Sequence, residues 1–159
     1  MTTLFLLDDE EWWPDDPTPG ALCSPTTYWA DEAEMGLPRE VVSEVAASVI
    51  SVEVGDGIER VAHIGDEFTT LLGTGETPVG EAVLRGCLVW DRYLWTAYRT
   101  PPTGRVRVLS LAGYVVQQVT RHATAHPGWS SPELHGPLEY RPAGEVESNV
   151  AVRWWVWEV

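Results

Sequence analysis

The chain has 159 residues, a formal net charge of −14 and 44% apolar residues. This length favours one domain with its own core, and the apolar fraction excludes disorder of the whole chain. No apolar run approaches the ~18 residues that span a bilayer, and the apolar start at 1–7 lacks a basic flank. We therefore expect no membrane contact and a cytoplasmic location, or a place in a virion if a phage encodes the chain.

Residues 1–37 form an acidic segment with nine carboxylates and no basic side chain. Four prolines interrupt it, which predicts a short edge strand at 3–7 followed by an extended arm. The arm also carries aromatic residues, among them Trp12 and Trp13, and a disordered tail is poor in such residues. We therefore divide the chain into an acidic arm, 1–37, and a single domain, 38–159.

Two helices are predicted in the domain. Valines at 41, 42, 45 and 49 recur at helical spacing after Pro38, a residue that suits a first helical turn. The second helix is predicted over 112–125, with Pro127 and Gly128 ending it.

The remaining elements are predicted as strands, because apolar residues alternate with polar ones or run together. These strands are 48–54, 58–64, 83–90, 105–109 and 149–159. Turns at 55–57 and at 91–92 predict two hairpins, the second ending near residue 99. The expected fold class is α+β, with a mostly antiparallel sheet of five to six strands covered by two helices.

Charge is divided unevenly along the chain. Residues 1–81 hold 18 carboxylates and two arginines, whereas 82–159 hold six carboxylates and eight arginines. One interpretation is internal pairing across the fold. The other is a contact with another protein, either copies of this chain docked head to tail or a basic partner steered by charge. A net charge of −14 disfavours nucleic acid as the partner.

Carboxylates, arginines and tryptophans of these segments are the candidate interaction residues, since charge steers encounters and indoles dominate contact energies. They are Asp8, Asp9, Glu10, Glu11, Trp12, Trp13, Arg92, Arg99, Arg105, Arg107 and Trp154.

One weak metal site is also predicted. His122 and His126 would share a face of the second helix, and His135 would return on the next loop as a third ligand. The helix lacks the glutamate of a zinc-hydrolase motif, and cationic side chains near a helix end need no metal to explain them.

No other cofactor site is expected. Residues 73–80 resemble a phosphate loop only superficially, because the Gly-Lys-Ser/Thr ending is missing. Cys87 is expected to be a small core residue, and a bridge to Cys23 is left open.

All ten basic residues are arginines, lysine is absent, and asparagine and isoleucine are scarce, which suggests a GC-rich bacterial or phage genome. We expect a non-catalytic protein-interaction protein, either a subunit of a virion-type assembly or an inhibitor or immunity protein of a basic enzyme. The alternative is a small metal-dependent hydrolase using His122, His126 and His135.

Overall fold

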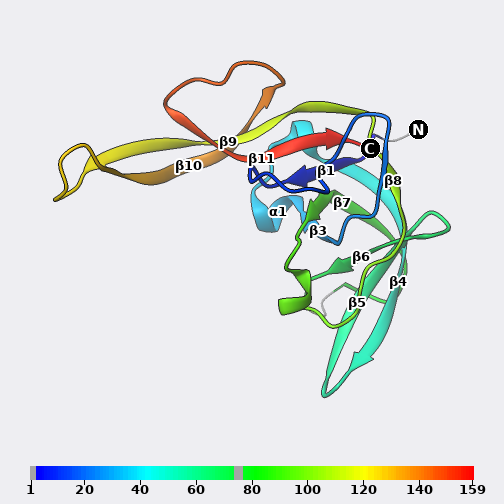
Figure 1. Cartoon of the computed structure of the whole chain (residues 1–159). Helices are drawn as coiled ribbons and strands as arrows, with labels where there is room; N and C mark the ends of the chain where they lie inside the picture. Colours follow the sequence, from blue (N-terminus) through cyan, green and yellow to red (C-terminus); the bar gives the residue numbers. More distant parts are fainter. Residues whose placement is uncertain (1–2, 74–76) are drawn as a thin grey trace.

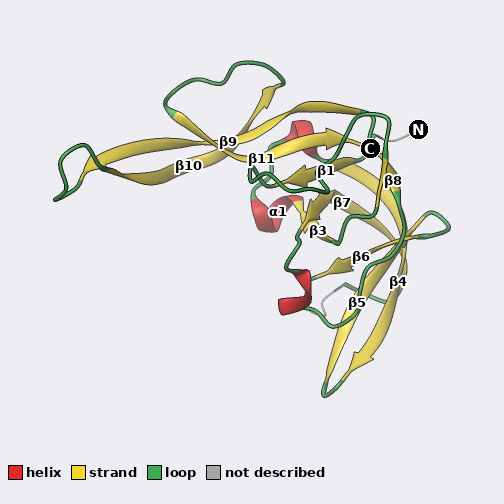
Figure 2. Cartoon of the chain, in the orientation of Figure 1, coloured by secondary structure: helices red, strands yellow, loops and turns green. Residues whose placement is uncertain are grey.

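The computed structural model describes residues 3–73 and 77–159, and nearly all its regular structure is β (Figures 1 and 2). Single helical turns form α1, Glu32–Met35, and the 3₁₀ turns η1, Arg39–Val41, and η2, Leu94–Thr96. The strands are β1 Phe5–Asp8, β2 Leu22–Cys23, β3 Thr27–Asp31, β4 Ser43–Val54, β5 Gly57–Ile64, β6 Phe68–Leu72, β7 Gly80–Trp90, β8 Val106–Arg107, β9 Ser110–Ala123, β10 Ser130–Pro142 and β11 Val150–Glu158.

The predicted α+β class is wrong, because both predicted helices are strands. Of the valines assigned to the first helix, Val41 ends η1, Val42 follows it, and those at 45 and 49 lie in the long strand β4. The predicted helix over 112–125 lies mostly in β9. β-Branched side chains lose rotamer freedom in a helix and pack well on a pleated sheet. Their spacing in these two segments fits a helical period by coincidence, and their residue type was the better signal.

Several strand predictions are confirmed. The first hairpin exists as β4 and β5, with Val54 opposite Gly57, and the closing strand exists as β11. The predicted second hairpin is wrong, since η2 and an irregular segment follow β7 instead. The predicted edge strand at the start is β1, which lies inside the sheet between β11 and β7. The predicted loop at 73–80 lies partly outside the described residues.

A closed ring of five strands forms the centre of the molecule. Its order is β7–β3–β6–β5–β4, and β4 pairs back onto β7 to close it. Residues 80–86 of β7 pair with β4, and farther along the same edge Leu88 and Val89 pair with β1 in parallel. β4 and β1 therefore pair with successive parts of one edge of β7. From β1 the sheet continues beyond the ring as four strands in the order β1–β11–β9–β10, which we call the wing.

Gly86 lies where β3 and β4 flank β7, and no larger residue fits there. A Cβ atom built at this position would lie 1.9 Å from the carbonyl oxygen of Ala30 in β3. The close approach of the strands at this point therefore requires glycine.

Two apolar clusters hold the ring and the wing together. The first, which includes Trp29, Val49, Leu84 and Leu88, gathers side chains from β1, β3, β4, β5, β6, β7 and β11. The second includes Val89, Val115 and Val156, together with residues of the α1–η1 segment. No helix in the described part of the chain is long and apolar enough to cross a membrane.

Candidate interaction surfaces

Arg92, two residues beyond the end of β7, binds the acidic N-terminal segment. Its Nη1 donates to Asp8 Oδ1 at 2.6 Å, its Nε to Asp15 Oδ1 at 3.1 Å and its Nη2 to Asp16 Oδ1 at 3.2 Å. Only 8% of the arginine side chain is exposed, and Asp8 is fully buried. Internal pairing therefore accounts for part of the charge division seen in the sequence.

Two tryptophans enclose the same guanidinium. Its carbon lies 4.0 Å from the centroid of Trp90 and 5.1 Å from that of Trp13. The Trp13 indole N–H donates to Asp9 Oδ1 at 2.9 Å, and Tyr93 meets the Trp13 ring edge-on with centroids 5.9 Å apart. Cation–π contacts of this kind are stronger when, as here, the cation is withdrawn from water.

Three carboxylates around one guanidinium leave the cluster with an excess of two negative charges when all are ionised. Burial raises the pKa of the Asp8 carboxyl above its ordinary value, against the opposing effect of its bond with Arg92. The Arg92 pKa is also raised, because the carboxylates outweigh the cost of burial. Asp15 differs from Asp8, since 63% of its side chain faces solvent.

A second set of bonds fastens the arm farther along. β2 pairs with β8, Gly20 N donates to Val108 O at 2.8 Å, and Arg107 Nη1 donates to Gly20 O at 2.7 Å. Arg92 and Arg107, both predicted as interaction residues, thus bind this chain's own first segment. β1 and β3, which lie within 1–37, are strands of the same sheet as β4 to β7.

Of the other predicted basic residues, Arg99 lines a hollow together with Arg92. Arg99 N donates to both oxygens of Glu59, which also accepts from Thr100 N. Burial raises the Glu59 pKa, but these bonds together outweigh it, so the pKa is lowered. Arg105 is exposed beside β8. Trp154 is half-buried in β11, with the guanidinium of Arg153 5.2 Å from its ring.

An acidic and aromatic surface lies outside the Arg92 cluster. Glu10 and Glu11 are exposed, and so are Trp12, at 81%, and Trp95, at 75%. A hollow of about 460 Å³ is lined by Trp13, Pro14, Asp15, Ser24, Thr26, Trp90 and Arg92. A smaller one of about 170 Å³ is also lined by Thr26 and Arg92, together with Trp95, Arg99 and two prolines. The two hollows are therefore neighbours that share two wall residues.

The tip of the β9–β10 hairpin forms a second surface. Gln118 is the last residue of β9 in register with β11, so from residue 119 to residue 137 the hairpin has no third strand (Figure 1). Residues 120–137 are all exposed, and Trp129 in the turn is 74% exposed. This part of the hairpin projects from the rest of the molecule.

The predicted histidine site lies on this hairpin, and the helix that was to align it does not exist. His122 in β9 and His135 in β10 face the same side, but His122 Nε2 bonds Glu133 Oε2 at 2.6 Å and His135 Nε2 bonds Thr120 Oγ1 at 2.8 Å. His126 lies in the turn between the strands. Within 3–73 and 77–159, no group of three or more His, Cys, Asp or Glu side chains is placed to hold a metal ion.

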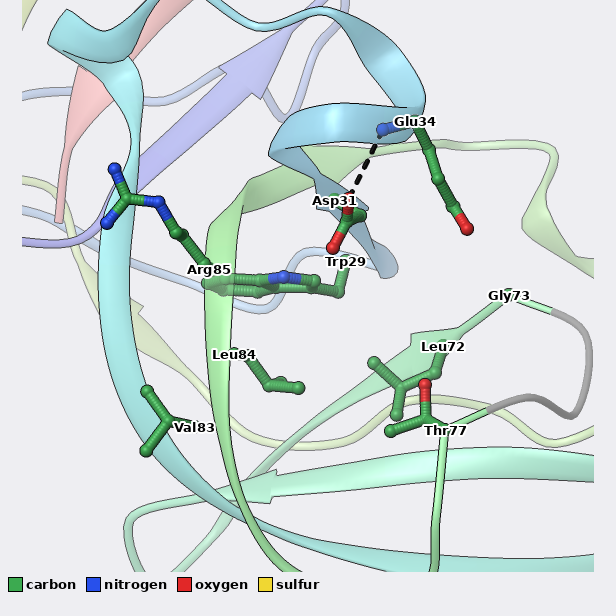
Figure 3. A pocket seen from close by; sticks show the side chains of 9 residues that line it. All are labelled: Trp29, Asp31, Glu34, Leu72, Gly73, Thr77, Val83, Leu84 and Arg85. Atoms are coloured by element: carbon green, nitrogen blue, oxygen red, sulfur yellow. Dashed lines mark hydrogen bonds between the residues drawn. The ribbon is translucent and has the colours of Figure 1, made fainter.

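Another hollow, of about 470 Å³, lies against β3 and β7 (Figure 3). Its wall includes Trp29, Asp31, Leu72, Leu84 and Arg85. Two polar side chains in this wall have partners within the fold, whereas the buried indole N–H of Trp29 has no hydrogen-bond partner among the described residues. Asp31 accepts from Glu34 N and caps α1, while Arg85 pairs with Glu32 and Glu44. Gly73 and Thr77 also line this hollow, and we assign it no ligand.

Both cysteines are free. Burial raises the Cys87 pKa to about 12, and burial together with nearby carboxylates raises the Cys23 pKa to about 11. Both thiols are therefore protonated at neutral pH and unsuited to act as nucleophiles.

Comparisons with protein-family models, curated proteins and solved structures found no match for this chain.

The sequence analysis did not assign Asp15, Asp16, Trp90 or Trp129 to a site. A signal for the first three existed in two short segments, Trp13-Pro14-Asp15-Asp16 and Trp90-Asp91-Arg92, whose indoles, carboxylates and guanidinium are complementary. Because the segments are more than 70 residues apart in the chain, only the fold brings them together.

Proposed function

We propose that this chain is a non-catalytic protein-interaction protein, a subunit of a larger assembly such as a virion, whose projecting hairpin contacts a neighbouring copy. The exposed hairpin at 120–137 is the observation that carries the proposal. A two-stranded hairpin is at best marginally stable alone in water, and more strands or a packing partner normally support it. A neighbouring copy would supply that support.

The two faces of the hairpin differ in polarity. Side chains alternate between faces along each strand, and residues opposite one another share a face. Val119 and Leu134 are opposite one another, Arg121 faces Pro132, and Ala123 lies on the same side. The other face carries the His122–Glu133 and Thr120–His135 bonds. We therefore assign the contact to the apolar face, together with Trp129.

Strand addition at the free edge of the hairpin is disfavoured. β10 is the last strand of the sheet and contains prolines at 132, 137 and 142. Proline has no N–H for a ladder, and natural sheets use it on edge strands to block pairing. The contact is therefore assigned to side chains of one face rather than to the backbone edge.

Measurement of oligomeric state tests the proposal. Light scattering coupled to size exclusion should show oligomers that grow with concentration, and the double variant Trp129→Ser/Leu134→Ser should be monomeric with an unchanged Tm. Val83→Ser is the matched control, because Val83 is 71% exposed and lies on β7, in the ring. A wild-type chain that stays monomeric at its highest soluble concentration would refute self-assembly through the hairpin.

A further inference from the structure

We infer that the projecting hairpin of one copy docks on residues 10–12 of the next copy, so that the chain assembles head to tail. This inference rests on the proposed function, because it names the surface of the neighbouring copy that receives the hairpin. A contact between two different surfaces is heterologous, and it produces rings or open chains rather than a closed pair.

The apolar face of the hairpin carries a cation and no carboxylate. Its residues are Val119, Arg121, Ala123, Ser130, Pro132 and Leu134. Arg121 is exposed, whereas the arginines that form ion pairs in the described part of the chain are Arg85, Arg92 and Arg141. Two such faces packed on one another would bring together two cations without a carboxylate. The face is therefore better matched by a surface that supplies carboxylates.

Residues 10–12 form a surface of the opposite kind. Trp12 is 81% exposed, and the carboxylates of Glu10 and Glu11 beside it are exposed and belong to none of the ion pairs among residues 3–73 and 77–159. Exposed indoles are the side chains that contribute most to protein contacts. Trp95 is similarly exposed, but it shares a hollow with Arg92 and Arg99, so its surroundings would repel a face that carries a cation.

Hydrogen bonds hold residues 10–12 in place before any partner binds. Asp9 Oδ1 accepts from Glu11 N at 3.2 Å and from Trp13 Nε1 at 2.9 Å, and Trp13 N donates to Asp16 Oδ2 at 2.9 Å. The exposed side chains therefore project from a turn that is fixed at both ends. A surface that is already ordered loses less conformational entropy on binding.

The two surfaces of one molecule are too far apart to meet. Asp8, at the end of β1, is level with Tyr114 of β9 across β11. Asp8 and Asp16 both bind Arg92, so the segment between them stays near this level. From Tyr114, β9 runs about 23 Å to Arg121, at about 3.3 Å per residue, and the turn lies farther still (Figure 1). The hairpin therefore reaches residues 10–12 only on another copy.

A mixture of two variants, each lacking one of the surfaces, tests the inference by light scattering coupled to size exclusion. The hairpin variant is Trp129→Ser/Leu134→Ser, and the arm variant is Glu11→Arg/Trp12→Ser. Each should be monomeric alone, because its remaining surface finds no complement on its own copies. An equimolar mixture should form a one-to-one dimer and nothing larger, because the intact hairpin of the arm variant docks on the intact arm of the hairpin variant.

Glu53→Arg/Ile58→Ser is the matched control for the arm variant. Glu53 and Ile58 are opposite one another in the β4–β5 hairpin, and both are exposed. The control makes the same change in net charge and also removes an exposed apolar side chain, but at a different surface. It should form the same oligomers as wild type.

Charge reversal tests the pairing of the two surfaces. Arg121→Glu and Glu11→Arg should each weaken association about tenfold, because each brings like charges together. The double variant Arg121→Glu/Glu11→Arg should regain association, since the charges are again opposite. A double variant that associates no better than either single variant would contradict this pairing.

The outcomes separate this inference from the proposed function. An arm variant that forms oligomers like wild type, while the hairpin variant is monomeric, would refute docking on residues 10–12 and leave the proposed function intact. Two monomeric variants that do not combine would refute the head-to-tail arrangement, and so would a loss of assembly in the Glu53→Arg/Ile58→Ser control. A monomeric wild type, or a hairpin variant that still forms oligomers, would refute both.

Discussion

Replacement of Arg92 by methionine tests the physical account of the arm most directly. Methionine preserves much of the apolar stem but leaves the Asp8 carboxylate buried without its partner. Removal of one member of a buried ion pair costs about 3–5 kcal/mol, and loss of the cation–π contact with Trp90 adds about 1 kcal/mol. The bonds to the more exposed Asp15 and Asp16 add little. We therefore expect the free energy of unfolding to fall by about 4–6 kcal/mol.

Thermal and urea unfolding, followed by tryptophan fluorescence, measure this loss. At about 2–4 °C per kcal/mol for a domain of this size, Tm should fall by about 8–24 °C. Arg85→Met is the matched control, because Arg85 also binds two carboxylates, Glu32 and Glu44, but is 53% exposed. Its Tm should remain close to that of wild type, since exposed ion pairs contribute little.

The double variant Asp8→Asn/Arg92→Met identifies the cause of the loss. The double variant has no buried carboxylate left without a partner. It should therefore be more stable than Arg92→Met alone, even though it carries one substitution more. An Arg92→Met protein as stable as Arg85→Met would refute the reasoning. A double variant less stable than Arg92→Met would show that the unpaired Asp8 carboxylate is not the source of the loss.

Three further predictions concern single sites. The pKa of Glu59 is lowered in the fold, so its ionised carboxylate stabilises the fold above about pH 4.5, and this stabilisation is lost as the pH falls through the folded pKa. When the free energy of unfolding is measured with urea at a series of pH values, Glu59→Gln should lack this part of the loss at acid pH. Gly86→Ala should destabilise the fold by about 3 kcal/mol through its clash with the β3 backbone, whereas Gly73→Ala, with no neighbour within 4 Å of the added atom, should have little effect on Tm. Cys87 should react with a thiol reagent at pH 7 only after denaturant is added, and rapid labelling of the native protein would contradict its burial.

Local patterns predicted strands where the turn chemistry was explicit. Gly55 and Gly57 flank the β4–β5 turn, and the alternation on either side sets a register that the structure keeps. Periodicity gave a wrong prediction over 112–125, where valines at 115, 116 and 119 fit the spacing of a helix but lie in the strand β9. In a long strand that is buried at one end and exposed at the other, alternation is weak, so periodicity alone cannot distinguish strand from helix.

Ring closure could not be predicted from the sequence. It depends on β7 pairing with β4 along one edge and with β3 along the other, and on the parallel β3–β6 contact of Tyr28 with Leu71. Such contacts join segments far apart in the chain, and their formation depends on summed burial rather than on any local motif. Gly86 is the one residue that marks the crossing, and it is indistinguishable in sequence from a turn glycine.

The divided charge of the sequence has both an internal and an external consequence. Arg92 neutralises one of the three carboxylates around it, and Arg107 binds a backbone carbonyl rather than a carboxylate, so the arm remains strongly acidic after it has folded. If internal pairing were the only role of the acids, one buried aspartate would serve Arg92, and exposed Glu10 and Glu11 beside Trp12 would add only repulsion. The carboxylates that Arg92 does not neutralise therefore stay on the surface of the folded arm, where Glu10 and Glu11 adjoin the exposed indole of Trp12.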